Sequence, residues 1–447
     1  MIFYHRYDRI TLDFYLSHIY HDTNNMIKRD ILAKIMPWVG KEKILVLKGS
    51  RQVGKTTLLR QIESEIKGCQ QTAVVAYLSA DDLDNRRFFQ SPDALELYLR
   101  QRYGFPGNFI YLMIDEFQAI PNAGIFLKNL FDRNKKNVQF IVSGSSSLEI
   151  TKNTEFLTGR ALNFMIERVS FFEYFKYIQN LDIEVLSIER EKELRLFYDT
   201  YPQKLEMAFG EYLKFGGYPE VATTSAVDDK KLILSSISKT YIEKDIINFL
   251  KVENVAGFNS LLKLLAEQSG KLVNKNELSN TLSMSINTVK KYAEFLSGTY
   301  VVNFLKPFSS NLRIEITKMP KVYILDLGLR NYLLDSWNSE TVSGDGDAVE
   351  NFVYLTLLAR RDAESIRFYR TIGGAEIDFL LEENDGSLTS CEVKYREKIS
   401  GIPTAMKNAK ERYPQKIKRQ IIITKRTLLI DKDVWFIPAV LLPFVKW

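Results

Sequence analysis

Residues 49–57 read GSRQVGKTT, directly after the apolar run ILVLK at residues 44–48 and directly before the helix-like stretch TLLRQIESEI. The spacing is G-x-x-x-x-G-K-T, in which Gly49 and Gly54 allow the backbone turn that aims N–H groups at phosphate oxygens. A helix that starts near Lys55 adds the positive end of its dipole. A strand, this loop and a helix in this order predict a Walker A site for nucleotide phosphates.

The residue types in this loop indicate how a nucleotide would be held. Lys55 is expected to reach the β- and γ-phosphates of ATP, and Thr56 is expected to ligate Mg²⁺. ATP and Mg²⁺ are therefore the expected cofactors. The residues predicted to contact the nucleotide are Gly49, Ser50, Arg51, Gln52, Val53, Gly54, Lys55, Thr56 and Thr57.

An acidic pair, Asp115 and Glu116, closes the apolar run FIYLMI at residues 109–114. Asp115 is predicted to support Mg²⁺, and Glu116 is predicted to orient and deprotonate the attacking water. Such a pair can also simply cap the helix that follows. Its position two strands after the strand of the phosphate loop favours the catalytic interpretation, a Walker B pair.

Two further groups are candidates for the same site. The run QFIVS at residues 139–143 ends in serines, and Ser143 and Ser145 are candidates to sense the γ-phosphate. The alternative is an ordinary serine-rich turn. Arg160 is a candidate arginine that acts in trans on the site of a neighbouring subunit, which implies a homo-oligomer. An exposed arginine also has many structural explanations.

The pattern of apolar residues predicts the fold class. Residues 171–248 are helical in pattern, whereas residues 366–394 alternate with a period of two and contain turns at Gly373–Gly374 and Asp385–Gly386, as in hairpins. The first third instead holds four short runs that are apolar on both faces, which is typical of a buried parallel sheet covered by helices. These runs span residues 44–48, 73–78, 109–114 and 139–143.

Residues 257–311 are predicted to form three short helices followed by an extended pair. Ser285 caps the third helix, INTVKKYAEFLS. This is the layout of a helix-turn-helix with a recognition helix and a wing, and DNA is the expected partner. The alternative is a winged helix that packs on protein. The buried stripe would hold Ile286, Val289, Ala293 and Leu296, and the exposed face Asn287, Thr288, Lys290 and Lys291.

The last hundred residues contain four side chains that can build a phosphodiesterase site: Glu350, Asp378, Glu392 and Lys394. Glu392 and Lys394 share one face of a strand, and the turn at residues 385–386 brings Asp378 beside them. Asp378 and Glu392 are predicted to ligate Mg²⁺ or Mn²⁺, with Glu350 completing the shell and Lys394 orienting water. The alternative is a solvated, charged hairpin.

The segments GSRQVGKTTLL, IDEFQ, VSGSSS and LTGRA, in this order, resemble the archaeal and bacterial AAA-type ATPases that carry a C-terminal domain of unknown function. VSFFEYF, YLKFGGYPE and YIEKDI are also similar to that family. The resemblance implies an AAA-like core with the sensor strand between the phosphate-loop strand and the Asp115 strand. Ser50 departs from the family, which more often has proline there. The spacing D-x13-E-x-K at Asp378, Glu392 and Lys394, with Glu350 upstream, resembles the PD-(D/E)XK nuclease fold. The ordered set G-x-x-x-E, EIDF and EVK is also similar to the C-terminal half of the same ATPase family.

We therefore expect an α/β fold in three parts. An AAA-like P-loop parallel-sheet domain with a helical lid spans residues 1–245, a winged helix-turn-helix domain spans 246–335, and a small restriction-endonuclease-like α/β domain spans 336–447. The expected function is ATP hydrolysis that controls a DNA-binding C-terminal region, with DNA cleavage left open. The alternatives are a regulatory switch or a protein-remodelling ATPase with a non-cleaving tail.

Composition restricts the remaining function classes. No apolar run approaches the roughly 20 residues that span a membrane, so no membrane partner is expected. Cys69 and Cys391 lie too far apart in sequence for a disulfide framework or a zinc motif, which fits a reducing cytoplasm. The formal charge of +6 permits contact with nucleic acid without arguing for it.

Overall fold

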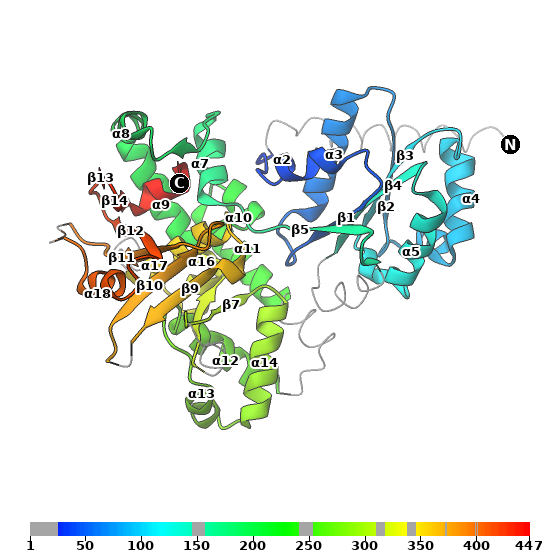
Figure 1. The fold of residues 1–447 in the computed structure, drawn as a ribbon. Helices are drawn as coiled ribbons and strands as arrows, with labels where there is room; N and C mark the ends of the chain where they lie inside the picture. The colour runs from blue at the N-terminus through cyan, green and yellow to red at the C-terminus, as the bar shows by residue number, and fades with distance from the viewer. Residues whose placement is uncertain are drawn as a thin grey trace.

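A computed structural model describes residues 26–144, 157–240, 254–309, 318–337, 346–371, 373–397, 399 and 401–447. Ser145, a candidate to sense the γ-phosphate, lies outside these residues. Figure 1 shows an α/β lobe coloured blue to cyan and a second lobe coloured green to red.

The first lobe is built on a sheet of five parallel strands in the order β2-β3-β4-β1-β5. Strand β4 lies between β1 and β3, as the resemblance implied. Parallel strands end at one edge of a sheet, so the segments after β1, β3 and β4 meet there. The bounds are β1 Ile44–Lys48, β2 Val74–Ser79, β3 Ile110–Asp115, β4 Val138–Gly144 and β5 Ala161–Met165.

Helices cover both faces of this sheet because its strands are apolar on both faces. Leu45 and Leu47 pack with helix α3 (Lys55–Cys69) on one face, together with α2 (Leu32–Ile35). Ile44 and Val46 pack on the other face with α4 (Pro92–Tyr103) and α5 (Ala123–Asn134). Alternate residues of β1 thus pack into the two apolar cores on opposite faces of the sheet.

Between the first sheet and residue 240, the structure describes five helices. Two of them, α7 and α9, share one core with the last hundred residues, including Phe352 and Phe444. The domain boundary predicted at residue 245 stays a prediction, but the apolar packing runs across it. The bounds are α7 Phe171–Gln179, α8 Glu191–Thr200, α9 Pro202–Phe215, α10 Pro219–Thr223 and α11 Val227–Thr240.

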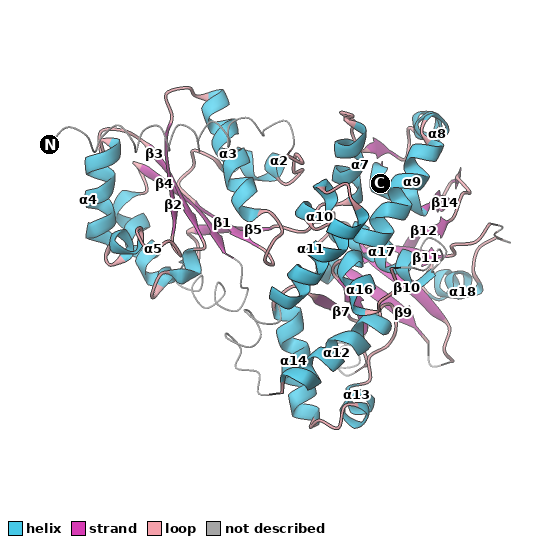
Figure 2. Ribbon diagram, turned by 180° about the vertical axis from the view of Figure 1, so that it is seen from behind, coloured by secondary structure: helices cyan, strands magenta, loops and turns pink. Residues whose placement is uncertain are grey.

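Three further helices and a two-stranded antiparallel ribbon form a unit with α10, α11 and α16 (Leu327–Leu333). Polar side chains cap each of the three helices at its N-terminus, and Ser285 accepts the Thr288 amide as predicted. Figure 2 shows this unit at one end of the second lobe. Its elements are α12 Val255–Glu267, α13 Lys275–Thr281, α14 Ile286–Gly298, β7 Val302–Leu305 and β8 Lys321–Ile324.

A six-stranded mixed sheet in the order β13-β14-β12-β11-β10-β9 completes the chain. Helix α17 (Gly346–Leu358) packs on one face, and α18 (Thr404–Arg412) packs on the other. The predicted turns join antiparallel pairs β9–β10 and β10–β11. The strands are β9 Ile366–Arg370, β10 Glu376–Glu382, β11 Leu388–Val393, β12 Ile417–Thr424, β13 Leu429–Asp431 and β14 Val434–Pro438.

The remaining elements are short. Strand β6, which lies between α7 and α8, pairs in parallel with β15. Within the described residues, no helix is both long and apolar enough to cross a membrane. The bounds are η2 Met36–Trp38, η3 Arg86–Phe89, η4 Phe117–Ala119, β6 Leu186–Ser187, η8 Ala363–Ser365, η9 Ala439–Phe444 and β15 Val445–Lys446.

Candidate active site

The phosphate loop connects β1 to α3 at the carboxyl edge of the first sheet. At Gly49 a Cβ would lie 2.4 Å from the Ile166 carbonyl oxygen, so only glycine fits. Gly54 has φ +87°, a left-handed conformation that favours glycine, and α3 begins at the next residue, Lys55. The two glycines and the helix N-terminus take the places that the sequence predicted.

Lys55 is buried, and two of its partners are backbone carbonyls of its own loop. Its Nζ donates to the Gly49 oxygen at 3.1 Å and to the Ser50 oxygen at 2.7 Å. The Ser50 hydroxyl is buried, and in the described part of the chain it has no hydrogen-bond partner. A buried ammonium among neutral carbonyls at a helix N-terminus fits an anionic phosphate.

Asp115 ends β3 beside this loop and is held by four donors. Its Oδ2 accepts from Thr56 Oγ1 at 2.6 Å and from the Tyr77 hydroxyl at 2.9 Å. Its Oδ1 accepts from the Ser143 hydroxyl and from the Glu116 amide. The structure thus brings together Thr56, Asp115 and Ser143, three of the residues proposed from the sequence. Adjacent hydroxyl and carboxylate oxygens are the hard ligands that Mg²⁺ prefers, so the residues fit the ion.

Tyr77 is a member of this cluster that sequence reasoning missed. It lies on β2, whose parallel register with β3 places Ser79 opposite Asp115 and thus Tyr77 near the same strand end. Burial, and then the charge of Asp115, raise the pKa of the Tyr77 hydroxyl. The phenol therefore stays protonated and donates to the carboxylate. The register of adjacent parallel strands is the signal that could have identified it.

Glu116 adopts φ +51°, a left-handed conformation that costs a non-glycine residue on the order of 1 kcal/mol. Its carboxylate accepts from the Gln118 side-chain amide, another contact that sequence reasoning missed. Its amide lies 3.4 Å from Ser143 Oγ, the residue predicted to sense the γ-phosphate. The turn therefore places the backbone amide of Glu116 next to the serine of β4, while its carboxylate binds Gln118.

Arg160 lies where the strands of the sheet begin, whereas the phosphate loop lies where β1 ends. Its carbonyl accepts the Ile44 amide at the start of β1, whereas the loop follows the end of that strand. Five residues of strand separate these ends by roughly 16 Å. The Arg160 guanidinium forms a two-bond pair with Asp132 of α5 at 2.7 and 3.0 Å. Arg160 therefore does not serve its own loop, and its role in trans stays a prediction.

A buried arginine connects the phosphate loop to α7. Arg29 donates to the Val53 carbonyl at 3.0 Å, to the Glu167 carbonyl at 2.7 Å and to Glu173 Oε1 at 3.1 Å. Glu173 in turn accepts the amide of Ser170 and forms the capping box of α7. Both partners of the ion pair are less than a tenth exposed. The loop is therefore tied to a helix whose apolar face lies in the second lobe's core.

A second junction continues from α7 toward the three-helix unit. Arg168 donates to the Tyr218 hydroxyl at 3.2 Å and to the Tyr300 carbonyl at 2.8 Å. Asp326 accepts the Gly217 amide at 2.8 Å, and burial raises the pKa of this carboxyl. Arg168, which follows the first sheet, thus contacts the residue before α10 and the turn after α14.

Helix α14 exposes three of the four residues that the sequence placed on its polar face. Asn287, Lys290 and Lys291 are exposed, whereas Thr288 is half-buried and its amide is bound by the Ser285 cap. The buried face holds Val289, Tyr292, Ala293 and Leu296, and Ile286 is only half-buried.

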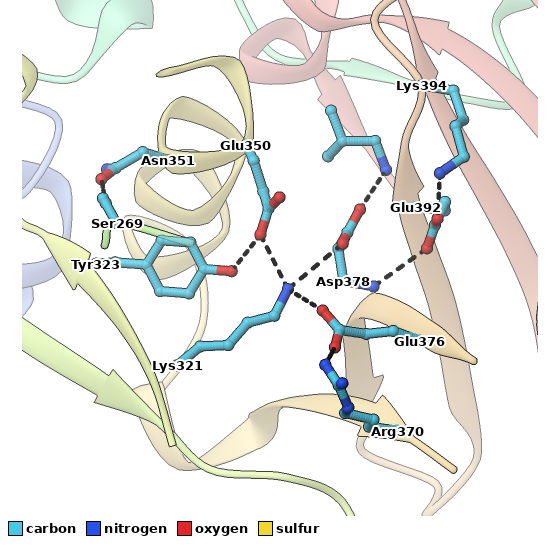
Figure 3. Close-up of polar contacts among 11 residues, drawn as sticks. Ser269, Lys321, Tyr323, Glu350, Asn351, Arg370, Glu376, Asp378, Glu392 and Lys394 are labelled. Carbon is cyan, nitrogen blue, oxygen red and sulfur yellow. Dashed lines mark hydrogen bonds and ion pairs between the residues drawn. The ribbon is translucent and has the colours of Figure 1, made fainter. Parts of the chain in front are cut away.

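The predicted carboxylates of the second sheet are brought together by the β10–β11 hairpin. Asp378 Oδ2 accepts the Val393 amide at 2.8 Å, and the Asp378 amide lies 3.2 Å from Glu392 Oε2. Lys394 donates to Glu392 Oε1 at 2.6 Å. Asp378, Glu392 and Lys394 therefore converge on one end of the hairpin (Figure 3).

Glu350 reaches the same region from α17, but through a lysine that sequence reasoning missed. Lys321 Nζ lies 3.1 Å from Glu350 Oε1, 2.6 Å from Glu376 Oε1 and 3.5 Å from Asp378 Oδ1. The Tyr323 hydroxyl also donates to Glu350, at 2.7 Å. Figure 3 shows the ammonium among these carboxylates. No signal in the sequence pointed to Lys321, which lies 29 positions from Glu350 and 57 from Asp378.

Burial changes the acidity of this cluster. It raises the pKa of Glu350 to about 7 and that of Glu392 to about 7, and the charge of Asp378 contributes to both shifts. In the part of the chain that the structure describes, no three acidic, histidine or cysteine side chains gather closely enough to hold a metal ion. The metal site of Asp378 and Glu392, completed by Glu350, therefore stays a prediction.

Comparison with protein families divides the chain into three matched segments. Residues 41–175 match the model of an AAA domain. Residues 206–340 and 345–442 match two domains of unknown function, DUF8612 and DUF4143. The first match agrees with the strand order and with the Thr56–Asp115–Ser143 cluster. The first lobe is thus an AAA-type ATPase domain, which supports ATP binding and hydrolysis with Mg²⁺.

Similar proteins align over most of the chain. An uncharacterized protein of Methanocaldococcus jannaschii is 27% identical over 83% of this chain and 81% of its own length. An uncharacterized protein of Haemophilus influenzae is 24% identical over 80% of this chain and 85% of its own. AMPPCP-bound DnaA from Aquifex aeolicus is 16% identical and covers 60% of this chain and 86% of its own, with a TM-score of 0.27.

Proposed function

We propose that this protein is an ATP-driven switch whose nucleotide state controls DNA binding by the second lobe. The observation that carries the proposal is Arg29, whose guanidinium binds both the Val53 carbonyl of the phosphate loop and Glu173 of α7. Any shift of the loop on nucleotide binding changes these buried contacts. Because α7 packs in the second lobe's core, the change is passed to that lobe.

At the nucleotide site, this chain's own residues bind, orient and accept protons. Lys55 moves its ammonium from the loop carbonyls to the β- and γ-phosphates. Thr56 and Asp115 are the residues that would hold Mg²⁺, which supplies charge neutralisation on the phosphates when bound. Glu116 orients the attacking water and accepts its proton, and Ser143 senses the γ-phosphate. Arg160 acts on the site of a neighbouring copy in a homo-oligomer.

The DNA-binding surface is the exposed face of α14, in a unit that we interpret as a winged helix with β7 and β8 as the wing. Asn287, Lys290 and Lys291 point away from the buried stripe of this helix. Lysines that contact phosphates release counterions, so affinity for DNA should fall steeply with salt. The alternative, a protein-remodelling ATPase with a packing-only winged helix, requires no such dependence.

The test compares two variants of equal charge change. Lys290→Glu/Lys291→Glu should weaken binding of a labelled DNA duplex and reduce the slope of log affinity against log salt by about 2, one for each lost phosphate contact. Lys192→Glu/Lys204→Glu changes exposed lysines on α8 and α9 and serves as the control. Equal slopes in both variants, matching the unchanged protein, would exclude α14 as the DNA-binding face.

A second candidate function is metal-dependent phosphodiester cleavage by the second sheet. It is favoured by the element order α17-β9-β10-β11-α18-β12, which we interpret as a nuclease-like fold, and by the convergence of Asp378, Glu392 and Lys394. Purified protein with supercoiled and linear plasmid, with and without ATP, and with Mg²⁺ or Mn²⁺, tests it. Nicking that is lost in Asp378→Asn supports cleavage. Intact plasmid under all conditions would exclude cleavage and leave DNA binding as the role of this fold.

A further inference from the structure

A lysine side chain occupies the point between two of the carboxylates predicted to build the metal site, Glu350 and Asp378. Lys321 is only 2% exposed, and its ammonium lies within 3.5 Å of oxygens from Glu350, Glu376 and Asp378. A divalent ion shared by Glu350 and Asp378 needs their oxygens at about 2.0–2.6 Å from one point between them. The ammonium stands at that place (Figure 3).

We propose that Lys321 is a built-in counter-ion that excludes divalent metal from the carboxylate site until strand β8 moves away from α17. The inference rests on the proposed nuclease-like site and adds its regulation. The charges support two exclusive states. Lys321 and Arg370 face the three carboxylates of Glu350, Glu376 and Asp378, which leaves one formal negative charge. A divalent ion added to the ammonium would reverse that sign, whereas an ion in its place would neutralise the cluster.

The Lys321 side chain is buried, and the strand that carries it is fastened to α17. Asn351, next to Glu350, donates to the Ile324 carbonyl at 2.9 Å and accepts the Ile324 amide at 3.2 Å. The Phe368 ring lies 5.8 Å from the lysine nitrogen. Buried polar groups in such a network are costly to separate. A shift of β8 relative to α17 would break these contacts and move the ammonium away from the carboxylates.

The position of Lys321 in the chain connects this site to the three-helix unit. Strand β8 pairs with β7, which follows α14 after a short turn, and Lys321 lies opposite Leu305 in that pair. The unit proposed to bind DNA thus carries the residue that closes the carboxylate site. A divalent metal ion then enters the carboxylate site only when this unit moves and carries Lys321 away.

The experiment measures Mn²⁺ binding by calorimetry, without nucleotide, on full-length chains. Lys321→Met removes the ammonium and keeps the length of the side chain. Lys271→Met is the matched control, since Lys271 pairs with Asp347 of α17 at 3.2 Å but is largely exposed. Lys321→Gln is the second variant if Lys321→Met does not fold, as judged by circular dichroism. Asp378→Asn added to either variant assigns the metal to this site.

We expect Lys321→Met or Lys321→Gln to bind Mn²⁺ at least tenfold more tightly than the unchanged protein and Lys271→Met, and Asp378→Asn to abolish the gain. Equal Mn²⁺ affinity in all folded variants, with binding lost in Asp378→Asn, would refute the role of Lys321 while leaving the metal site of the proposed function standing. Folded Lys321 variants that bind no Mn²⁺ would refute the inference together with that metal site. Neither result tests the proposal that α14 binds DNA.

Discussion

Replacement of Arg29 by methionine tests whether the phosphate loop is tied to α7 through one buried guanidinium. Methionine keeps much of the side-chain volume and removes every donor. The Val53, Glu167 and Arg168 carbonyls lose their contacts at 3.0, 2.7 and 3.3 Å, and Glu173 loses its ion pair at 3.1 Å. Glu173 keeps the amides of Asp30 and Ser170 as donors.

The expected magnitude follows from burial. Removing one partner of a buried ion pair leaves an uncompensated charge, and this costs about 3–5 kcal/mol in free energy of unfolding. The Arg29–Glu173 pair meets that condition, with side chains 8% and 6% exposed. Glu173→Gln leaves one acceptor oxygen for the Asp30 and Ser170 amides, which bind different oxygens of Glu173, and it leaves the Arg29 guanidinium without its counter-ion, so a similar cost of about 3–5 kcal/mol is expected. The double variant should cost less than the sum, by roughly 0.5–3 kcal/mol, because the two side chains interact directly.

Urea unfolding followed by circular dichroism measures these differences, with ATP affinity as the functional readout. Arg133→Met is the control, since its pair with Asp93 has side chains 51% and 80% exposed and should contribute under about 1 kcal/mol. Loss of the Val53 contact should also weaken ATP binding about tenfold, or ~1.4 kcal/mol. The reasoning is refuted if Arg29→Met is no more destabilising than Arg133→Met, or if the single costs add in the double variant.

Three further predictions concern the other sites. Lys55→Ala should abolish ATP hydrolysis, and Glu116→Gln should keep ATP binding but slow turnover at least about a hundredfold in a phosphate-release assay; wild-type turnover would exclude Glu116 as the base. Arg160→Ala should flatten the rise of ATPase rate per subunit with protein concentration, and a rate independent of concentration in the unchanged protein would remove the trans role. Burial raises the pKa of Glu350 to about 7 from an ordinary value of 4.5, so the folded state holds a proton that the unfolded chain releases. Free energy of unfolding should therefore fall between about pH 4.5 and pH 7, by at most ~1.4 kcal/mol per unit for this group, and Glu350→Gln should reduce the slope measured by urea titration.

The nucleotide site could be predicted from the sequence because its residues are close together along the chain. Gly49, Gly54 and Lys55 lie within seven consecutive positions, and the loop conformation depends on those residues and on the strand and helix beside them. Asp115 was identified because parallel strands end at one edge of a sheet. The Ser285 cap and the β10–β11 turn were local in the same way, and both occur in the structure.

Long-range packing decided the rest. Arg29 and Glu173 are 144 positions apart, and neither lies in a periodic pattern that marks the other as its partner. The shared core of α7, α9 and the second sheet likewise depends on which apolar faces meet, and many faces are equally apolar in sequence. Lys321 could have been any lysine on an exposed strand. Only the tertiary fold buries it among three carboxylates, because charge neutralisation in a low-dielectric interior selects partners by distance in space and not along the chain.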